Sequence, residues 1–342
     1  MKPQKWIGIL SLIGLITFSQ CKKEINNPFD SACPPDIWAP QALSAVQSGA
    51  TIVLSWTQDI TNISGFKIER KISSGTWEVI ATVEKNLLTF IDSDLIGNFS
   101  HDYRVHAYAG SNQSNSIQIQ ITPVLTDGLQ GTLSYHGVNY KTVWIDGRNW
   151  LAENLRTTKY RDDSDITTGL TPTLWNENTS GAYTVYPHSM IGGLNSDAEV
   201  LNAYGALYNH YAVTSSKGLC PAGWHVSTEA EINSLINYGG GAEIAGGKLK
   251  SMRTAPTAHP RWDSPNTAAN DHYGFSALPG GFFAGQTNEY GGLGLYGYWW
   301  CQTSGTDPDF GRVFLIGYDA AWAISGQVQR SIGFPVRCIR NN

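Results

Sequence analysis

Residues 137–155 have the sequence GVNYKTVWIDGRNWLAENL, and this stretch carries the clearest structural signal in the 342-residue chain. Apolar and β-branched residues flank the pair Asp146-Gly147. This pair favours a two-residue β-turn, because Asp and Gly both tolerate the positive φ angles that such a turn requires. We therefore predict a β-hairpin, with strands at 140–145 and 150–151, near the start of a C-terminal domain at residues 128–342.

Two helices are predicted downstream of the hairpin. Apolar residues recur with the helical period over 197–211, where they form one continuous face. A second helix is expected over 228–238, because Thr228 and Glu231 match a capping box. Short strands separated by glycine-rich loops are expected to follow until the end of the chain. This order of elements predicts an α+β fold for the C-terminal domain.

Upstream of the hairpin, residues 38–123 alternate between apolar and polar side chains in short runs. The runs 52–56, 66–70 and 103–107 have a period of two, and turns that contain Ser and Gly lie between the runs. This pattern predicts an all-β sandwich. The chain is therefore expected to be multidomain, with a β-sandwich followed by an α+β domain.

The sandwich segment also resembles a fibronectin type III domain. The resemblance rests on LSW at 54–56, FKIER at 66–70, TFID at 89–92 and YRVHA at 103–107. It implies that Trp56 and Tyr103 pack in the core. It also implies that the sandwich is a spacer, which would hold the C-terminal domain away from a membrane.

The first residues of the chain indicate export. Two lysines precede an uncharged, mostly apolar run at 6–18, which is shorter than the ~20 residues needed to span a bilayer and typical of a signal peptide. The next residues, SQCKKE at 19–24, resemble a bacterial lipoprotein signal. We expect a signal peptide at 1–20 and lipid attachment at Cys21, with ordinary cleavage nearby as the alternative.

This lipoprotein resemblance implies a protein that is anchored by lipid to the bacterial outer membrane. We expect the protein at the cell surface, and a location facing the periplasm remains the alternative. Residues 21–37 are polar and contain three prolines, so they predict a linker between the anchor and the sandwich.

The composition limits the possible partners. The chain has 23 Lys and Arg residues against 28 Asp and Glu residues, which gives a net charge of −5. Because there is no basic excess to neutralise phosphates, nucleic acid is not expected as a partner. Only 15% of the residues are charged, a low fraction that is common in exported β-rich proteins.

The C-terminal domain resembles the Fibrobacter succinogenes major paralogous domain. The motifs that carry this resemblance are YGALYN at 204–209, GLCPAGWHV at 218–226, GGKLK at 246–250, GFSALPGG at 274–281, YWW at 298–300 and VRCI at 336–339. Three residues depart from the family pattern, namely Ser227, Cys301 and Pro335. The family is known from secreted and surface proteins, and its biochemical role is largely undefined. The domain also looks like the C-type-lectin-like fold that formylglycine-generating enzymes share.

Four cysteines remain once Cys21 is assigned to lipid, and three pairings of them are possible. An exported protein favours disulfides. Cys220 and Cys338 both belong to motifs of the family, so the resemblance points to a disulfide between them. Cys33 and Cys301 could then form a second pair or stay free.

No short motif indicates catalysis, and we predict no catalytic residues. Spacings typical of zinc sites, such as CxxC and HExxH, do not occur. The acidic run at 162–165 does not fit a regular calcium loop, so it predicts at most an irregular calcium site near Asp163 and Asp165. We otherwise expect no metal and no cofactor.

An aromatic, glycine-rich stretch at 290–300, YGGLGLYGYWW, supplies the candidate ligand-binding residues. Flat aromatic rings beside flexible backbone suit stacking on sugar rings or contact with a protein partner. The candidates are Tyr290, Tyr296, Tyr298, Trp299 and Trp300. Trp299 and Trp300 also fit a core position, which leaves Tyr290 and Tyr296 as the stronger surface candidates.

We therefore expect a lipid-anchored surface protein that binds a polysaccharide or another surface protein and is not an enzyme. One alternative is a copper-dependent enzyme related to formylglycine-generating enzymes, which would need two adjacent free thiols, Cys301 among them. Another alternative is a purely structural surface component. The fold alone does not decide between these functions.

Overall fold

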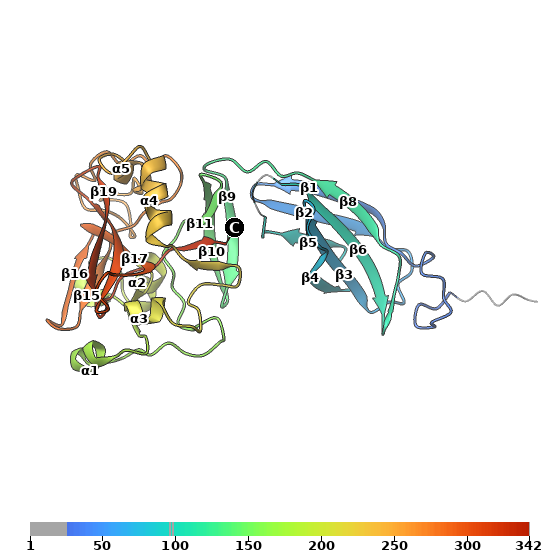
Figure 1. The fold of residues 1–342 in the computed structure, drawn as a ribbon, viewed down its shortest axis with the longest axis horizontal. Coiled ribbons are helices and arrows are strands. Elements are labelled where there is room, and N and C mark those ends of the chain that lie inside the picture. Colours follow the sequence, from blue (N-terminus) through green and yellow to red (C-terminus); the bar gives the residue numbers. More distant parts are fainter. Residues whose placement is uncertain (1–25, 96, 98, 342) are drawn as a thin grey trace, which may run out of the picture.

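The computed structural model describes residues 26–95, 97 and 99–341. The expected signal peptide and the lipidation candidate Cys21 lie outside these residues. The described chain forms an N-terminal sandwich and a C-terminal head, which lie next to each other along the long axis (Figure 1). None of the helices in the described residues is long and apolar enough to cross a membrane.

The N-terminal part is a β-sandwich of two antiparallel sheets. One sheet has the order β1-β2-β5, formed by Gln41–Ser48, Thr51–Thr57 and Thr89–Asp92. In the other sheet, β4 (Glu78–Glu84), β3 (Gly65–Ile72) and β6 (His101–Ala109) are neighbours, and β6 also pairs with β7 (Asn112–Gln113) and β8 (Ile117–Ile121). Trp56 and Tyr103 are buried between the sheets, which confirms their predicted role as core residues.

The described part of the expected linker packs against the sandwich. The side chain of Asn112 donates a hydrogen bond to the carbonyl of Pro28 at 2.9 Å, and the Asn115 N–H donates to the carbonyl of Pro35 at 3.0 Å. Cys33 is buried in the sandwich core. The described part of the predicted linker, residues 26–37, is therefore mostly exposed but is attached to the sandwich at these points.

The head begins with the predicted hairpin. β10 (Val138–Ile145) and β11 (Arg148–Leu151) are antiparallel, with Ile145 opposite Arg148. Asp146 and Gly147 have φ angles of 52° and 68°, as the two-residue turn requires. The hairpin lies in a five-stranded sheet of order β14-β20-β11-β10-β9, completed by β14 (Trp224–Val226), β20 (Cys338–Arg340) and β9 (Gln130–Tyr135).

The rest of the head consists of short elements. Three further sheets pair β12 (Tyr183–Thr184) with β13 (Leu207–Tyr208), β15 (Gly280–Ala284) with β16 (Glu289–Leu293), and β17 (Tyr296–Ser304) with β18 (Phe310–Gly317) and β19 (Ala323–Gln329). The short helices are α1 (Pro172–Glu177), η1 (His188–Met190), α3 (His210–Val213) and α5 (Ala245–Leu249). Buried aromatic and aliphatic side chains fill the space between them.

Of the two predicted helices, the second is confirmed and the first is shorter than predicted. α4 (Glu229–Tyr238) has Thr228 as its N-cap, and Thr228 and Glu231 form the predicted capping box. α2 (Asp197–Tyr204), in contrast, ends seven residues before the predicted end at residue 211. Gly205 adopts a φ of 83°, and a Cβ there would lie 2.6 Å from the side chain of Asn154, so the chain must turn away at this point.

The sandwich and the head are in direct contact. Arg340, in the last strand of the head, donates a hydrogen bond to the carbonyl of Leu95 at 2.7 Å and forms an ion pair with Asp94. Trp144 of β10 packs in the same hydrophobic cluster as the sandwich core. The sheet that contains β9, β10 and β11 faces the sandwich (Figure 1).

Candidate functional site

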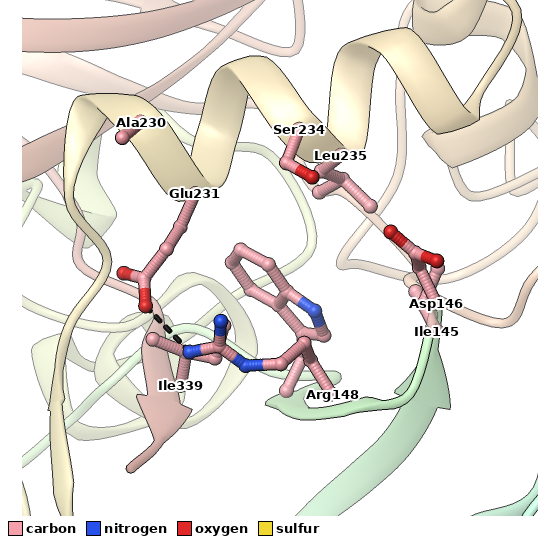
Figure 2. Close-up of a pocket in the computed structure, with 9 residues that line it drawn as sticks. Ile145, Asp146, Arg148, Ala230, Glu231, Ser234, Leu235 and Ile339 are labelled. Atoms are coloured by element: carbon pink, nitrogen blue, oxygen red, sulfur yellow. Dashed lines mark hydrogen bonds and ion pairs between the residues drawn. The ribbon is translucent and has the colours of Figure 1, made fainter. Parts of the chain in front are cut away.

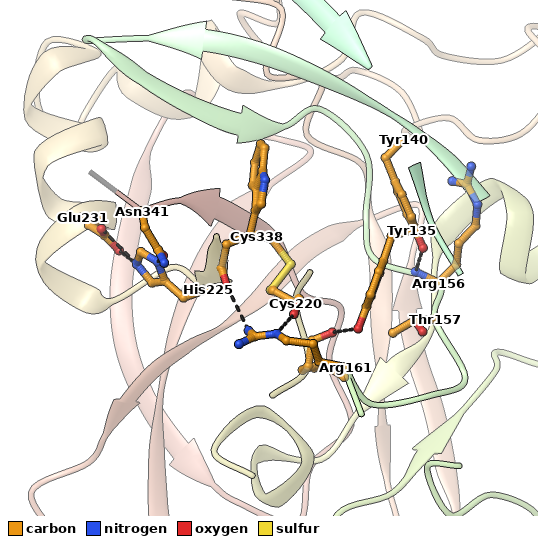
Figure 3. Close-up of a disulfide and its surroundings, with 12 residues drawn as sticks. Tyr135, Tyr140, Arg156, Thr157, Arg161, Cys220, His225, Glu231, Cys338 and Asn341 are labelled. Carbon is orange, nitrogen blue, oxygen red and sulfur yellow. Dashed lines mark hydrogen bonds and ion pairs between the residues drawn. A yellow bond between two sulfur atoms is a disulfide. The ribbon is translucent and has the colours of Figure 1, made fainter. Parts of the chain in front are cut away.

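A disulfide joins Cys220 to Cys338, as the sequence predicted. Their Cα atoms lie 6.0 Å apart, and the bond connects the segment before β14 to the last strand, β20. Figure 3 shows Arg161 beside this bond, where its Nε donates to the carbonyl of Cys220 at 2.7 Å. The disulfide thus closes a loop that contains most of the head.

The second suggested pair, Cys33 and Cys301, is wrong for the described structure. Both cysteines are free and buried, but Cys33 lies in the sandwich core and Cys301 lies in a core cluster of the head. Burial raises the pKa of the Cys301 thiol to about 12. The described residues therefore contain no two adjacent free thiols of the kind that the copper-enzyme alternative requires.

A network of polar side chains surrounds Glu231 at the start of α4. Its carboxylate accepts hydrogen bonds from His225 at 2.9 Å and from the N–H of Thr228 at 2.8 Å, and it forms an ion pair with Arg148 at 2.5 Å. Burial raises the pKa of this carboxyl, but these partners outweigh it and the pKa falls to about 2. His225, which also contacts Asn341, has a raised pKa because of its bond to Glu231 (Figure 3).

We expect Glu231→Gln to lower the free energy of unfolding by about 3 kcal/mol at pH 7. A carboxyl with a lowered folded-state pKa contributes stability above its unfolded value of 4.5, and this contribution is lost as the pH falls toward 2. Urea unfolding of both proteins between pH 2 and pH 7 should therefore give converging stabilities at the acidic end. Glu229→Gln, in the same helical turn, is the matched control. Its partly exposed ion pair with Arg312 predicts a change below about 1 kcal/mol.

The aromatic candidates do not form one exposed surface. Trp299 and Trp300 are fully buried, and their indole N–H groups donate to Asn154 and to the carbonyl of Tyr208. As ligand-binding residues they are therefore wrong, because core packing uses both rings. Tyr298 is partly exposed, but its ring stacks on Phe334.

The two tyrosines that were the stronger surface candidates are only partly exposed. The ring of Tyr290 stacks on Phe283, and its hydroxyl is 2.7 Å from the hydroxyl of Thr184. Tyr296 lies beside Tyr298 at a centroid distance of 5.8 Å. Tyr296 is therefore the candidate with the fewest other contacts.

The acidic run at 162–165 forms an exposed turn. The carboxylate of Asp162 accepts hydrogen bonds from Ser164, whereas Asp163 lies 3.4 Å from His136 and Asp165 forms a separate ion pair with Lys159. Within the described ranges, no three His, Cys, Asp or Glu side chains are grouped so that they could hold a metal ion.

An apolar pocket of about 200 Å³ lies between α4 and the β10–β11 hairpin (Figure 2). Its floor contains buried side chains of β10, β11, β20 and α4, namely Ile145, Trp150, Ile339 and Leu235. Figure 2 shows the ion pair between Arg148 and Glu231 at one end of the pocket and Asp146 at the other end. The Arg148 and Glu231 side chains at its rim are already paired with each other, so the pocket offers few free polar groups to orient a ligand.

A second, polar cleft of about 280 Å³ lies elsewhere on the head. It is lined by β9 and β10, by the segment after β11, by the end of α2, and by the loops around residues 251–260 and 274–278. The side chains of Gln130, Lys141 and Asn202 line it and are exposed, and none of them has a hydrogen-bond or ion-pair partner within the described residues. A cleft into which several polar side chains converge is a candidate binding site for a polar ligand.

The charged residues at the cleft are mostly basic. Lys141, Arg156 and Arg253 line it, together with the single carboxylate of Glu153. Glu153 is already engaged, since it accepts a hydrogen bond from the N–H of Lys141 at 2.9 Å and lies 3.7 Å from Arg156. The exposed surface of the cleft therefore carries a positive excess.

The fully buried side chain of Arg337 lies directly beneath this cleft. Its guanidinium donates to Asn154 Oδ1 at 2.9 Å and to the carbonyls of Leu151, Phe275 and Ser276 at 2.9, 2.7 and 2.9 Å. Asn154 and Ser276 themselves line the cleft. None of these four acceptors is a carboxylate, so burial lowers the pKa of Arg337 to about 9.

No motif in the sequence marks this cleft. Its lining comes from separate segments between residues 130 and 278, and no two of its cationic residues form a recognisable motif. The one available signal was Arg337 in the VRCI motif, which is a charged residue within the otherwise apolar run at 334–339.

Comparison with known proteins gives one family match. Residues 143–340 match the model of the Fibrobacter succinogenes major domain. No curated protein matches the chain.

Solved structures similar to this chain include fibronectin type III-like domains. An Fn3-like protein from Clostridium thermocellum is 23% identical, with 25% of this chain and 94% of that chain covered and a TM-score of 0.22. A structure described as a myokine is 21% identical, covers 25% of this chain and 98% of that chain, and has a TM-score of 0.24. A redesigned β-sandwich protein is 17% identical, with 25% and 92% covered and a TM-score of 0.22.

Proposed function

The chain belongs to the Fibrobacter succinogenes major domain family, and from the polar cleft of its head we propose that the protein is a non-enzymatic module that binds a saccharide. The observation that carries this proposal is the group of unpartnered side chains, Gln130, Lys141 and Asn202, at one cleft. Amide and ammonium groups are suited to the many hydroxyls of a sugar, which both donate and accept hydrogen bonds.

The cysteines support binding over thiol catalysis. Cys220 and Cys338 are joined in a disulfide, and the thiol of Cys301 is fully buried with a pKa of about 12. A reactive cysteine needs a thiolate that substrate can reach. The described thiols of the head do not meet this condition.

The proposed setting of this module is the bacterial cell surface. In this proposal Cys21 carries lipid, the sandwich is a fibronectin type III-like spacer, and the head has a C-type-lectin-like arrangement. The contact between Arg340 and Asp94 supports a spacer that presents the head in a fixed orientation. The early helices α2 and α4, and the shared sheet of β9 and β20, support the lectin-like arrangement.

We expect the purified protein to bind members of a panel of immobilised saccharides, and we expect Asn202→Trp to abolish this binding. Asn202 is exposed near the end of α2, so an indole at this position would fill the cleft. A loss of tenfold or more in affinity corresponds to at least 1.4 kcal/mol. Binding should be measured by surface plasmon resonance and folding by circular dichroism.

Asn233→Trp is the matched control, because Asn233 is also an exposed asparagine on a helix but does not line the cleft. If the Asn202→Trp variant bound saccharide as tightly as the unchanged protein, the cleft would be refuted as the binding site. Loss of binding in Tyr290→Ala or Tyr296→Ala, with Asn202→Trp unaffected, would move the site to the aromatic stretch. A folded protein that binds no saccharide would contradict the proposed function and favour a protein partner or self-association.

A further inference from the structure

We propose that the ligand of the polar cleft is an anionic saccharide, in which a sugar carries a carboxylate or a sulfate. This inference rests on the proposed function and narrows the class of ligand. It follows from the distribution of charge around the cleft, which differs from that of the head as a whole.

The head is acidic overall, but its cleft is basic. Residues 128–342 contain 17 Asp and Glu and 14 Lys and Arg, a net charge of −3. The cleft reverses this balance with the three cations Lys141, Arg156 and Arg253 against Glu153. A basic cleft on an acidic domain attracts a negatively charged ligand to that one part of the surface.

The cations are available to a ligand to different degrees. The ammonium of Lys141 is exposed and has no partner within the described residues. Arg253 is also exposed, and it uses one Nη atom on the carbonyl of Ala258 at 2.8 Å, which leaves other N–H groups of its guanidinium for a ligand. Arg156 is held more firmly, because it lies over the ring of Tyr140, donates to the carbonyl of Asn139 at 3.3 Å and lies 3.7 Å from the carboxylate of Glu153.

The buried guanidinium of Arg337 adds a positive charge beneath the cleft, which the nearby carboxylates of Glu153 and Asp271 offset in part. It is 1% exposed and bonds only to neutral acceptors, two of which belong to Asn154 and Ser276 in the cleft lining. A buried charge without a carboxylate partner is weakly screened by solvent. An anion in the cleft would therefore be attracted by Arg337 without displacing any of its hydrogen bonds.

The remaining lining fits the uncharged part of such a ligand. Gln130 and Asn202 offer amide donors and acceptors for the hydroxyls of a sugar, and the buried side chains of Ala152 and Leu278 complete the lining. Guanidinium groups can form two parallel hydrogen bonds to a carboxylate or to a sulfate. The cleft thus combines groups for hydroxyls with groups for one anionic substituent.

The test uses isothermal titration of the purified protein with matched saccharides. The probes are a tetramer of galacturonic acid, its carboxyl-reduced neutral counterpart, and a galactose oligomer that carries sulfate esters. We expect the acidic tetramer or the sulfated oligomer to bind at least tenfold more tightly than the neutral tetramer. This preference should weaken as salt rises, because solvent-exposed charges are screened.

The double variant Lys141→Gln/Arg253→Gln should lose at least tenfold in affinity for the anionic probe and little for the neutral one. Lys159→Gln/Lys217→Gln removes the same charge outside the cleft and is the matched control. Equal affinity for acidic and neutral tetramers would overturn the anionic class and leave the proposed function intact. If no probe binds the folded protein, both proposals fail. Anion binding that survives the Lys141→Gln/Arg253→Gln change would overturn the assignment to this cleft.

Discussion

Replacement of both Cys220 and Cys338 by alanine is expected to lower the free energy of unfolding by about 4–5 kcal/mol. The disulfide joins residues 118 positions apart. Without it, the unfolded chain gains the entropy of an open loop of that length, which is the main source of disulfide stability in the chain-entropy model. Because native domains are stable by only about 5–15 kcal/mol, this change should leave the head close to unfolding.

The architecture of the head makes this loss severe. β20 has only three residues, Cys338–Arg340, and it is the strand that joins β11 to β14 in the central sheet. The last residue of this strand, Arg340, forms an ion pair with Asp94 of the sandwich. Loosening the last strand would therefore disturb the sheet and the contact between the two parts together.

Thermal unfolding followed by circular dichroism should show a midpoint lower by about 10–20 °C for a domain of this size. Cys301→Ala is the control, since it removes a buried thiol that has no disulfide partner. It should cost about 1 kcal/mol through the small cavity alone. If the double variant unfolded at the same temperature as the unchanged protein, the disulfide would have no stabilising role.

The features that the sequence predicted well depend on neighbouring residues. The Asp146-Gly147 turn and the Thr228 capping box are local, since their geometry is set by two to four residues. The positions of Trp56 and Tyr103 follow from alternation along a strand. Such features can be predicted directly from the order of neighbouring residues.

The end of α2 shows why other boundaries were missed. The helical period continued to residue 211 because Leu207 and Tyr208 are apolar, but these residues are buried in β13 instead. What ends the helix is the close approach of Gly205 to Asn154, a residue 51 positions earlier. A contact between distant residues leaves no periodic signal.

The candidate site was missed for the same reason. Residues 290–300 were predicted to bind a ligand because their aromatic rings are suited to stacking. Burial depends on the whole fold, however, and it places Trp299 and Trp300 in the core. The cleft cations Lys141 and Arg253 are more than a hundred positions apart in the chain. Only the folded head brings them to one cleft.

Replacement of Arg337 by methionine is expected to lower the free energy of unfolding by about 3–5 kcal/mol. Replacing a buried ion pair by apolar residues is often neutral, because both partners leave together. Here only the donor is removed, and the carbonyls of Leu151 and Phe275 remain buried without it. Each unsatisfied acceptor costs about 1–3 kcal/mol, which outweighs the gain from no longer burying a charge.

Urea unfolding measures this loss, and Arg312→Met is the control. Arg312 is partly exposed and has one ion pair, with Glu229, so its replacement should cost less than about 1 kcal/mol. Addition of an anionic saccharide should raise the unfolding midpoint of the Arg312→Met variant. The increase should be smaller for the Arg337→Met variant, because this variant has lost a positive charge beneath the cleft. Equal stability of the Arg312→Met and Arg337→Met variants would show that solvent replaces the guanidinium at these carbonyls. In that case the buried charge would not stabilise the residues beneath the cleft.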